Sequence, residues 1–161
     1  SSSPRTATPT RDNRRERIRS TSDIETLMVL SKGECFNDFA DGMPMETQDR
    51  GARAENRVSF LLERKGWQLL ERNWSCRWGE LDLVLHRNER LLVVEVKGRR
   101  SMAWGAWSVD PAKRRRLGRA INCWRAEHPE QGDWLLQVAV AVVPLPPARG
   151  AVRWFGLDQL C

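Results

Sequence analysis

The sequence has few of the residues on which metal–thiolate and disulfide-rich proteins depend. Its 161 residues include only four cysteines and two histidines. The cysteines are scattered at Cys35, Cys76, Cys123 and Cys161, with no CxxC pair and no pair of histidines nearby. Because a structural zinc site needs clustered ligands, this pattern argues against one, and we expect four reduced thiols.

Long apolar runs and several familiar catalytic patterns are absent as well. The longest apolar run, around residues 138–143, is far shorter than the ~20 residues that a membrane-spanning helix needs. No charged segment followed by an apolar one opens the chain, so we expect a cytoplasmic protein with no membrane partner. There is no glycine-rich phosphate loop and no Ser-His-Asp order, and neither His86 nor His128 has a partner that suggests a catalytic base.

Charge and tryptophan content divide the chain into two unequal parts. The formal net charge is +6, from 27 Lys and Arg against 21 Asp and Glu. Residues 1–50 carry 8 basic and 9 acidic residues and no tryptophan, whereas residues 51–161 carry 19 and 12 and all eight tryptophans. We therefore expect one basic folded domain over residues 51–161. Its charge alone suits nucleic acid, an anionic membrane or simple solubility.

Residues 1–50 are expected to form a disordered tail. The opening stretch is rich in Ser, Thr, Pro and Arg, a composition that buries too little apolar surface to offset the entropy of ordering. The sequence does not begin with Met, while Met43 and Met45 lie just before the expected domain. We therefore regard residues 1–44 as dispensable and not part of the native domain, and expect a chain beginning at Met45 to fold cooperatively.

The hydrophobic pattern predicts an α-β-β-β-α-β order of elements. A helix is expected from residue 51 to a stop at Gly66, and Asp110 with Pro111 marks the start of a second helix. Strands are expected over residues 67–74, 79–86, 91–97 and 134–143, with a last short strand over residues 152–155.

The second and third strands form a predicted β-hairpin. If Asn88 and Glu89 make a two-residue turn, Asp82 lies opposite Glu95 and Glu80 lies opposite Lys97. Alternation then assigns one wholly apolar face to the core, made of Leu81, Leu83, Leu85, Leu92, Val94 and Val96. The other face carries the four charged residues at one end, beside Val84 and Val93.

Two carboxylates opposed across neighbouring strands repel each other, because their Cβ atoms lie ~4.5–5.5 Å apart. Either one carboxylate takes a proton or a cation lies between them, and oxygen ligands at this spacing suit Mg²⁺ or Mn²⁺. Lys97 shares this face, where an ammonium group can position water and offset phosphate charge during phosphodiester hydrolysis. The alternative is an ordinary Glu80–Lys97 ion pair beside solvated Asp82 and Glu95, and a one-residue slip in register would remove the site.

This D…ExK arrangement resembles the PD-(D/E)xK, or restriction-endonuclease-like, nucleases. More narrowly, residues 51–125 resemble the YraN-like family of predicted bacterial endonucleases, which is distantly similar to archaeal Holliday-junction resolvases. The matching stretches are Glu55 in the first helix, ERNW (71–74), GELDLV (79–84), VVEVKGR (93–99) and VDPAKRRRL (109–117). Two departures are Gly98 in place of the more usual Thr, and Leu135-Leu136-Gln137 in place of Arg-Phe-Asp.

The resemblance implies a fold and a set of roles. The fold is an α/β restriction-endonuclease-like core, with a mixed sheet flanked by helices. Asp82 and Glu95 are implied metal ligands together with the backbone carbonyl of Val96, Lys97 is the implied catalytic lysine, and Glu55 is an accessory acid. For Glu55, a surface glutamate without a role is an equal alternative.

A run of cations gives independent support for a nucleic-acid partner. Lys113, Arg114, Arg115 and Arg116 fall in the first turns of the second helix, where the helix dipole disfavours each cation by ~0.3–1 kcal/mol. A phosphate backbone would relieve this local conflict, and Arg99 with Arg100 would extend the same surface. The alternative is a solvated basic face.

Together these observations predict a Mg²⁺- or Mn²⁺-dependent endonuclease that hydrolyses phosphodiester bonds in DNA, including branched or damaged DNA. The alternative is a non-catalytic nucleic-acid-binding module that keeps the nuclease fold, and a weaker one is a protein-interaction domain. A homodimer is compatible with cutting branched DNA, but the sequence shows no interface.

Overall fold

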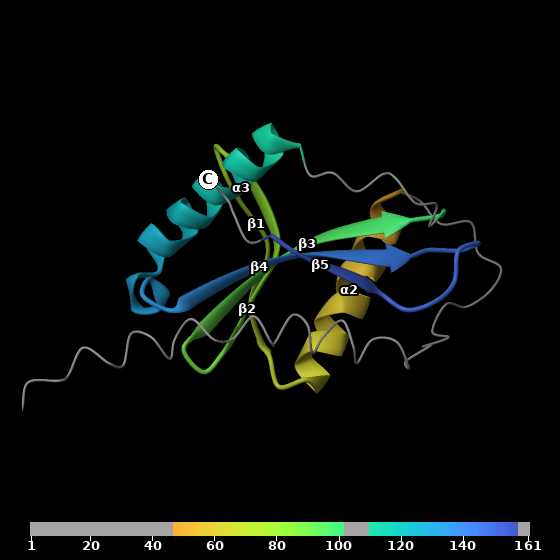
Figure 1. Cartoon of the computed structure of the whole chain (residues 1–161), viewed down its shortest axis with the longest axis horizontal. Helices are drawn as coiled ribbons and strands as arrows, with labels where there is room; N and C mark the ends of the chain where they lie inside the picture. The colour runs from red at the N-terminus through yellow and green to blue at the C-terminus, as the bar shows by residue number, and fades with distance from the viewer. Residues whose placement is uncertain (1–46, 102–109, 158–161) are drawn as a thin grey trace, which may run out of the picture.

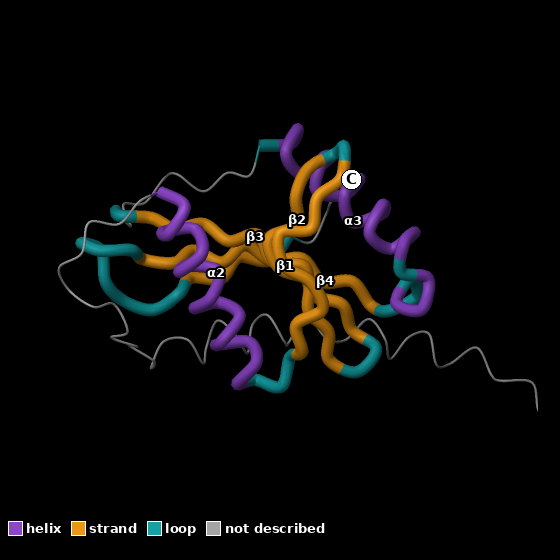
Figure 2. Tube along the Cα trace, turned by 180° about the vertical axis from the view of Figure 1, so that it is seen from behind, coloured by secondary structure: helices purple, strands orange, loops and turns teal. Residues whose placement is uncertain are grey.

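A computed structural model of the chain describes residues 47–101 and 110–157, which form a five-stranded sheet with a long helix on each face (Figures 1 and 2). The elements are α2 (Thr47–Arg64), β1 (Gln68–Cys76), β2 (Gly79–Arg87), β3 (Arg90–Arg99), α3 (Pro111–Glu127), the 3₁₀ helix η3 (Pro129–Gln131), β4 (Leu135–Pro144) and β5 (Arg153–Gly156). The predicted α/β class and order of elements are confirmed.

Several sequence predictions concern residues that the structure does not describe. The expected tail lies almost entirely outside the described residues, as do Cys35 and Cys161. Cys76 and Cys123 are free thiols, as expected. No helix within residues 47–101 and 110–157 is long and apolar enough to cross a membrane.

Helix α2 begins earlier than the hydrophobic pattern indicates. It starts at Thr47 rather than at residue 51, because its first turns carry polar residues and the buried stripe begins only at Ala54. Asp49 in the first turn interacts favourably with the helix dipole. The predicted stop is confirmed, since Gly66 has a φ of 87°, a left-handed conformation that favours glycine.

The sheet has the order β1-β2-β3-β4-β5, and all neighbours are antiparallel except the parallel pair β3–β4. The predicted hairpin register is confirmed by the pairs Leu83–Val94 and Arg87–Arg90, which leave Asn88 and Glu89 as the turn. A two-residue turn fixes the register of a hairpin, so the predicted turn accounts for the observed pairs from Arg87–Arg90 to Leu83–Val94. The predicted pairs Asp82–Glu95 and Glu80–Lys97 lie beyond the last observed pair.

Each face of the sheet carries its own hydrophobic core. On one face, α2 packs against β2, β3 and β4 through Ala54, Val58 and Leu62. On the other face, α3 packs through the predicted stripe, which is Leu117, Ala120, Ile121 and Trp124. Both faces of β3 are therefore covered, and residues Leu91 to Val96 are all buried.

The predicted apolar face was wrong at Leu81. This side chain packs with Val84 in the core beneath α3, whereas Leu83 and Leu85 pack beneath α2. Strand alternation is interrupted between Leu81 and Leu83, at Asp82. Asp82 and the residue opposite it, Asn73, are both missing from the paired positions of β1 and β2, and Asn73 has a left-handed φ of 49°.

The sheet forks at this interruption. Strands β2 and β3 pair only as far as Leu83 and Val94, whereas β3 stays paired with β4 as far as Arg99 and Pro144. In Figure 1 the end of the β1–β2 hairpin bends toward α3, while β3 and β4 continue toward the first turns of α2. The fork therefore separates the strands that carry Asp82 and Glu95.

Gly98 has a packing reason to differ from the threonine usual in the resembling family. A Cβ atom at this position would lie 2.5 Å from Leu145 Cδ1, and Leu145 is buried in the α2-side core. We expect Gly98→Thr to lower the free energy of unfolding by about 1–3 kcal/mol through overpacking. Urea unfolding measures this decrease in the free energy of unfolding. In a Leu145→Ala background, we expect Gly98→Thr to lower the free energy of unfolding by less than half as much. Equal costs in the two backgrounds would contradict the packing explanation.

Candidate active site

Glu95 on β3 is the centre of a charged cluster at the fork. It is 8% exposed and, with Ser59, is one of two polar or charged residues that are buried in the described part of the chain. Its Oε1 atom lies 2.6 Å from Lys97 Nζ and 2.6 Å from Lys113 Nζ. Two ammonium groups from different elements, β3 and α3, therefore converge on one buried carboxylate oxygen.

Asp82 faces this cluster from β2. Its Oδ2 atom accepts a 2.7 Å hydrogen bond from the Val96 backbone N–H, and continuing the hairpin register places Asp82 opposite Glu95. Burial and, next, the negative charge of Glu95 raise the pKa of Asp82 to about 7, against the lowering effects of the Val96 bond and Lys97. The predicted repulsion between the two carboxylates is thus relieved near neutral pH by a proton on Asp82.

Glu95 and Lys97 form the charged pair of the cluster. Burial alone would raise the pKa of Glu95, but hydrogen bonds from Lys113 and Lys97 outweigh it and lower the pKa below its ordinary value. Burial would likewise lower the pKa of Lys97, but the bond to Glu95 outweighs it and raises the pKa. Glu95 is therefore ionised and Lys97 protonated at neutral pH, and Lys97 pairs with Glu95 rather than with the exposed Glu80.

Glu55 on α2 approaches the cluster from the other side of the fork. Its Oε2 atom accepts a 3.1 Å hydrogen bond from Asn73 Nδ2, and its charge contributes to the raised pKa of Asp82. Asn73 belongs to the ERNW stretch but received no role from the sequence. The signal that could have singled it out is the residue type, because asparagine adopts the left-handed conformation more readily than other non-glycine residues.

The donor atoms at the fork suit a hard divalent cation. Asp82 and Glu95 supply carboxylate oxygens, and the Val96 carbonyl lies beyond the last β2–β3 pair. In an extended strand the N–H and C=O of one residue point to the same side, so this carbonyl is directed toward Asp82 with its N–H. Within residues 47–101 and 110–157 no three His, Cys, Asp or Glu side chains cluster as metal ligands. A cation bound by Asp82 and Glu95 would therefore need the Val96 carbonyl and water molecules as further ligands. Mg²⁺ suits such a site because it usually keeps several of its water ligands.

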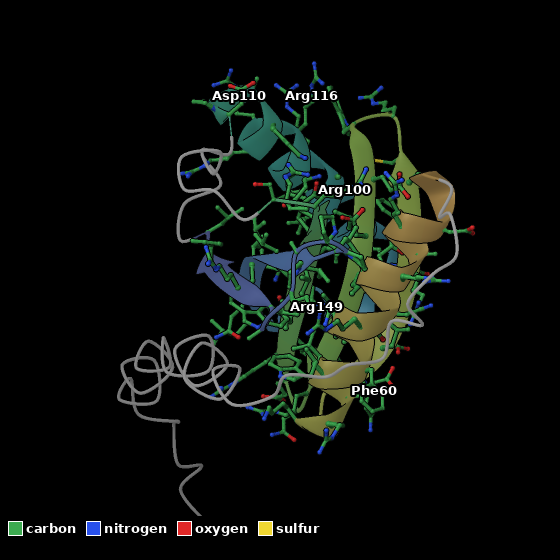
Figure 3. All side chains as sticks on the ribbon, turned by 90° about the vertical axis from the view of Figure 1, so that its right-hand side faces the viewer. Phe60, Arg100, Asp110, Arg116 and Arg149 are labelled. Carbon is green, nitrogen blue, oxygen red and sulfur yellow. The ribbon has the colours of Figure 1, made fainter. Side chains whose placement is uncertain are left out.

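The predicted nucleic-acid-binding cations divide into two groups. Lys113 pairs with Glu95, a contact that the sequence did not predict, although its side chain is 45% exposed, whereas Arg115 and Arg116 are exposed on α3 without contacting Glu95. Arg114 is half-buried on the same helix, Arg99 is half-buried at the end of β3, and Arg100 next to it is exposed. Figure 3 shows Arg100 and Arg116 in the same half of the molecule, with Phe60 at the opposite end.

The start of α3 is formed as the sequence predicts. The Asp110 side chain accepts a 3.2 Å hydrogen bond from the Ala112 backbone N–H, and Pro111 occupies the first turn. No acidic residue lies in that first turn. The run of cations therefore begins directly beyond a capped helix end, with Lys113 close enough to reach Glu95.

Comparisons with known proteins agree with the resemblance seen in the sequence. Residues 54–143 match the model of the uncharacterised protein family UPF0102. A UPF0102 protein of Parasynechococcus marenigrum is 76% identical over 134 residues, covering 83% of this chain and 100% of the relative. One from a Synechococcus strain is 56% identical over 116 residues, covering 70% and 96%, and one from Myxococcus xanthus is 35% identical over 102 residues, covering 62% and 81%. The chain therefore belongs to family UPF0102, the YraN-like family.

Proposed function

We propose that this protein is a metal-dependent nuclease that hydrolyses phosphodiester bonds in DNA. The observation that carries the proposal is the buried Glu95 carboxylate, which faces Asp82 and holds two lysine ammonium groups at 2.6 Å. Burying several ionisable groups together lowers the stability of a folded protein, compared with packing apolar side chains in the same space. Such a local conflict in an otherwise apolar sheet is typical of a functional site.

The carboxylates of Asp82 and Glu95 and the carbonyl of Val96 would hold the cation. When bound, a divalent cation polarises the phosphate and lowers the pKa of a coordinated water. With a cation bound, Asp82 would be ionised and would hold the cation in place of its proton. The half-buried position of Asp82, with one oxygen fixed by the Val96 N–H, keeps its carboxylate aimed into the fork.

Lys97 has the position and charge to stabilise the reacting phosphate. Its ammonium group stays protonated beside Glu95, and the side chain as a whole is 30% exposed, so Lys97 remains accessible to a substrate at the fork. A fixed ammonium donor can orient an attacking water and offset the negative charge that develops on the phosphate. Glu55, held by Asn73, is a further acid within electrostatic reach of Asp82.

Cleavage assays with the full chain test this function. Labelled linear duplex, single-stranded, flap and four-way-junction DNA are incubated with Mg²⁺ or Mn²⁺, and with EDTA as the control. We expect metal-dependent cleavage of at least one substrate. DNA binding that is indifferent to metal, with no cleavage of any substrate, would instead support the non-catalytic binding module. Binding that does not weaken with salt would support a protein-interaction domain, because phosphate contacts are salt-dependent.

Metal affinity is expected to depend on pH through Asp82. The cation competes with the proton that this carboxylate holds up to a pH of about 7. Mn²⁺ affinity should therefore rise by about tenfold per pH unit below the pKa and level off above it. Calorimetric titration of Mn²⁺ into the full chain at several pH values measures this.

The matched control for the metal titration is Glu80→Gln, which removes an exposed carboxylate two residues from Asp82. We expect this variant to bind Mn²⁺ as the parent does, and Asp82→Asn to lose binding. An affinity that stays constant between pH 5 and pH 7, or unchanged binding by Asp82→Asn, would contradict the assignment.

A further inference from the structure

Two arginines stack on one tryptophan outside the carboxylate cluster. Trp78 lies in the turn between β1 and β2, and the guanidinium carbons of Arg77 and Arg119 lie 4.6 Å and 4.5 Å from the centre of its ring. Arg77 precedes Trp78 in the turn, whereas Arg119 reaches it from α3. We refer to Arg77, Trp78 and Arg119 as the Trp78 cluster.

The Trp78 cluster carries positive charge without a matching carboxylate. Both arginines are exposed, and within residues 47–101 and 110–157 no ion pair or hydrogen bond involves either guanidinium. An indole attracts each cation, but two guanidinium groups on one ring repel each other. Their N–H edges remain available to an anion, so the cluster has the chemistry of an anion-binding site with its donors already ordered.

A row of cations on α3 connects this cluster to the candidate active site. Lys113, Arg116 and Arg119 are spaced three residues apart, so they lie on one ridge that winds around the helix, with Lys113 and Arg119 about 120° apart. The row spans roughly 9 Å along the helix axis. Its first member contacts Glu95 and its last contacts Trp78.

The β1–β2 hairpin closes the other side of this row. Trp78 directly precedes β2, and Asp82 lies four residues further along the same strand. Figure 1 shows this end of the hairpin against α3. The Trp78 cluster and Asp82 are thus joined by the β1–β2 hairpin, and Arg119 and Lys113 of α3 reach Trp78 and Glu95.

We propose that the Lys113–Arg116–Arg119 row and the Trp78 cluster bind the backbone of the DNA strand that leaves the active site. This inference rests on the proposed function and assigns the path of the substrate across the protein surface. One strand of duplex DNA carries a phosphate about every 3.4 Å along the axis, so the row matches two or three successive phosphates. Stacking on Trp78 orders the two guanidinium groups before binding and reduces the entropy that binding loses.

Binding measurements in EDTA test the path independently of cleavage. The Arg77→Gln/Arg119→Gln variant is compared with the parent by fluorescence anisotropy on duplex DNA between 50 and 200 mM salt, concentrations over which phosphate contacts dominate the affinity. We expect the variant to bind at least about tenfold more weakly at about 100 mM salt, and its salt slope to fall by about two.

The matched control is Arg64→Gln. Arg64 also stacks on an aromatic ring, with its guanidinium carbon 5.8 Å from the centre of Phe60. Phe60 lies at the opposite end of the molecule from Arg116 (Figure 3). This control removes one positive charge, where the double variant removes two, together with the same kind of contact. We expect its DNA affinity and salt slope to equal those of the parent.

Two outcomes would overturn the proposed path. If the parent binds DNA and the double variant binds equally well with the same slope, the Trp78 cluster serves only to hold the hairpin against α3. Loss of affinity in Arg64→Gln to the same extent as in the double variant would show a general charge effect. Failure of the proposed function appears differently, as DNA that is bound along this path but never cleaved with Mg²⁺ or Mn²⁺.

Discussion

Lys97→Ala is expected to lower the rate of DNA cleavage by at least about 100-fold, the usual cost of removing one electrostatic donor from an active site. The fold should survive, because Glu95 keeps its second ammonium partner, Lys113, at 2.6 Å. We expect the free energy of unfolding to stay within about 1 kcal/mol of the parent value. Single-turnover cleavage and urea unfolding measure the two quantities separately.

The matched control is Lys113→Ala, which removes an ammonium group at the same distance from the same Glu95 oxygen. Lys113 is more exposed and belongs to the basic row on α3, so its loss should weaken DNA binding more than the chemical step. If Lys97→Ala cleaves as fast as the parent while Lys113→Ala does not, the catalytic role belongs to α3 rather than to the ExK strand.

Asp82→Asn is expected to stabilise the protein at pH 8 while abolishing metal-dependent cleavage. The folded protein holds the pKa of Asp82 at about 7, against an ordinary value of 3.8, so ionising this carboxyl costs stability. Asparagine carries no charge and can still accept the bond from the Val96 N–H. We expect a gain of about 2 kcal/mol, which allows for the solvent screening of a half-buried carboxylate.

The sign of the pH dependence follows from the two pKa values of Asp82. Between pH 4 and pH 7 the folded parent binds more protons at Asp82 than the unfolded chain does, so the parent loses stability as the pH rises. The advantage of Asp82→Asn should therefore be absent near pH 4, grow through this window and level off above pH 7.

Urea unfolding in EDTA at pH 4, 6 and 8 measures the effect at Asp82. Glu80→Gln is the control, because it removes an exposed carboxylate from the same strand and should change stability little at any of these values. An Asp82→Asn protein that is less stable than the parent at pH 8 would show that the ionised carboxylate contributes to folding rather than opposing it.

Local patterns predicted the parts of the site that lie on one hairpin. The turn at Asn88 and Glu89 fixed the register of β2 and β3 as far as the pair Leu83–Val94, and continuing that register puts Asp82 opposite Glu95 just beyond the last pair. The start of α3 followed from Asp110 and Pro111 for a similar reason, because the capping interaction lies within one turn.

Contacts between distant elements could not be predicted in this way. The Lys113–Glu95 contact depends on how α3 crosses the sheet, and the Asn73–Glu55 bond on how α2 approaches β1. The face of Leu81 was mispredicted because strand alternation assumes a regular ladder, whereas the ladder between β2 and β3 ends beside Asp82. Each of these features is set by tertiary packing, which the order of residues along one element does not specify.

The hydrogen bond from the Val96 amide to Asp82 has a consequence for how the fork opens. β3 is the central strand, with both faces buried, so most of its amides can exchange with solvent only through large-scale unfolding. The Val96 amide is held instead by a half-buried side chain at the end of a ladder. Its hydrogen can exchange whenever the Asp82 carboxyl swings away, so it reports on rearrangement of the site while the rest of the sheet stays closed.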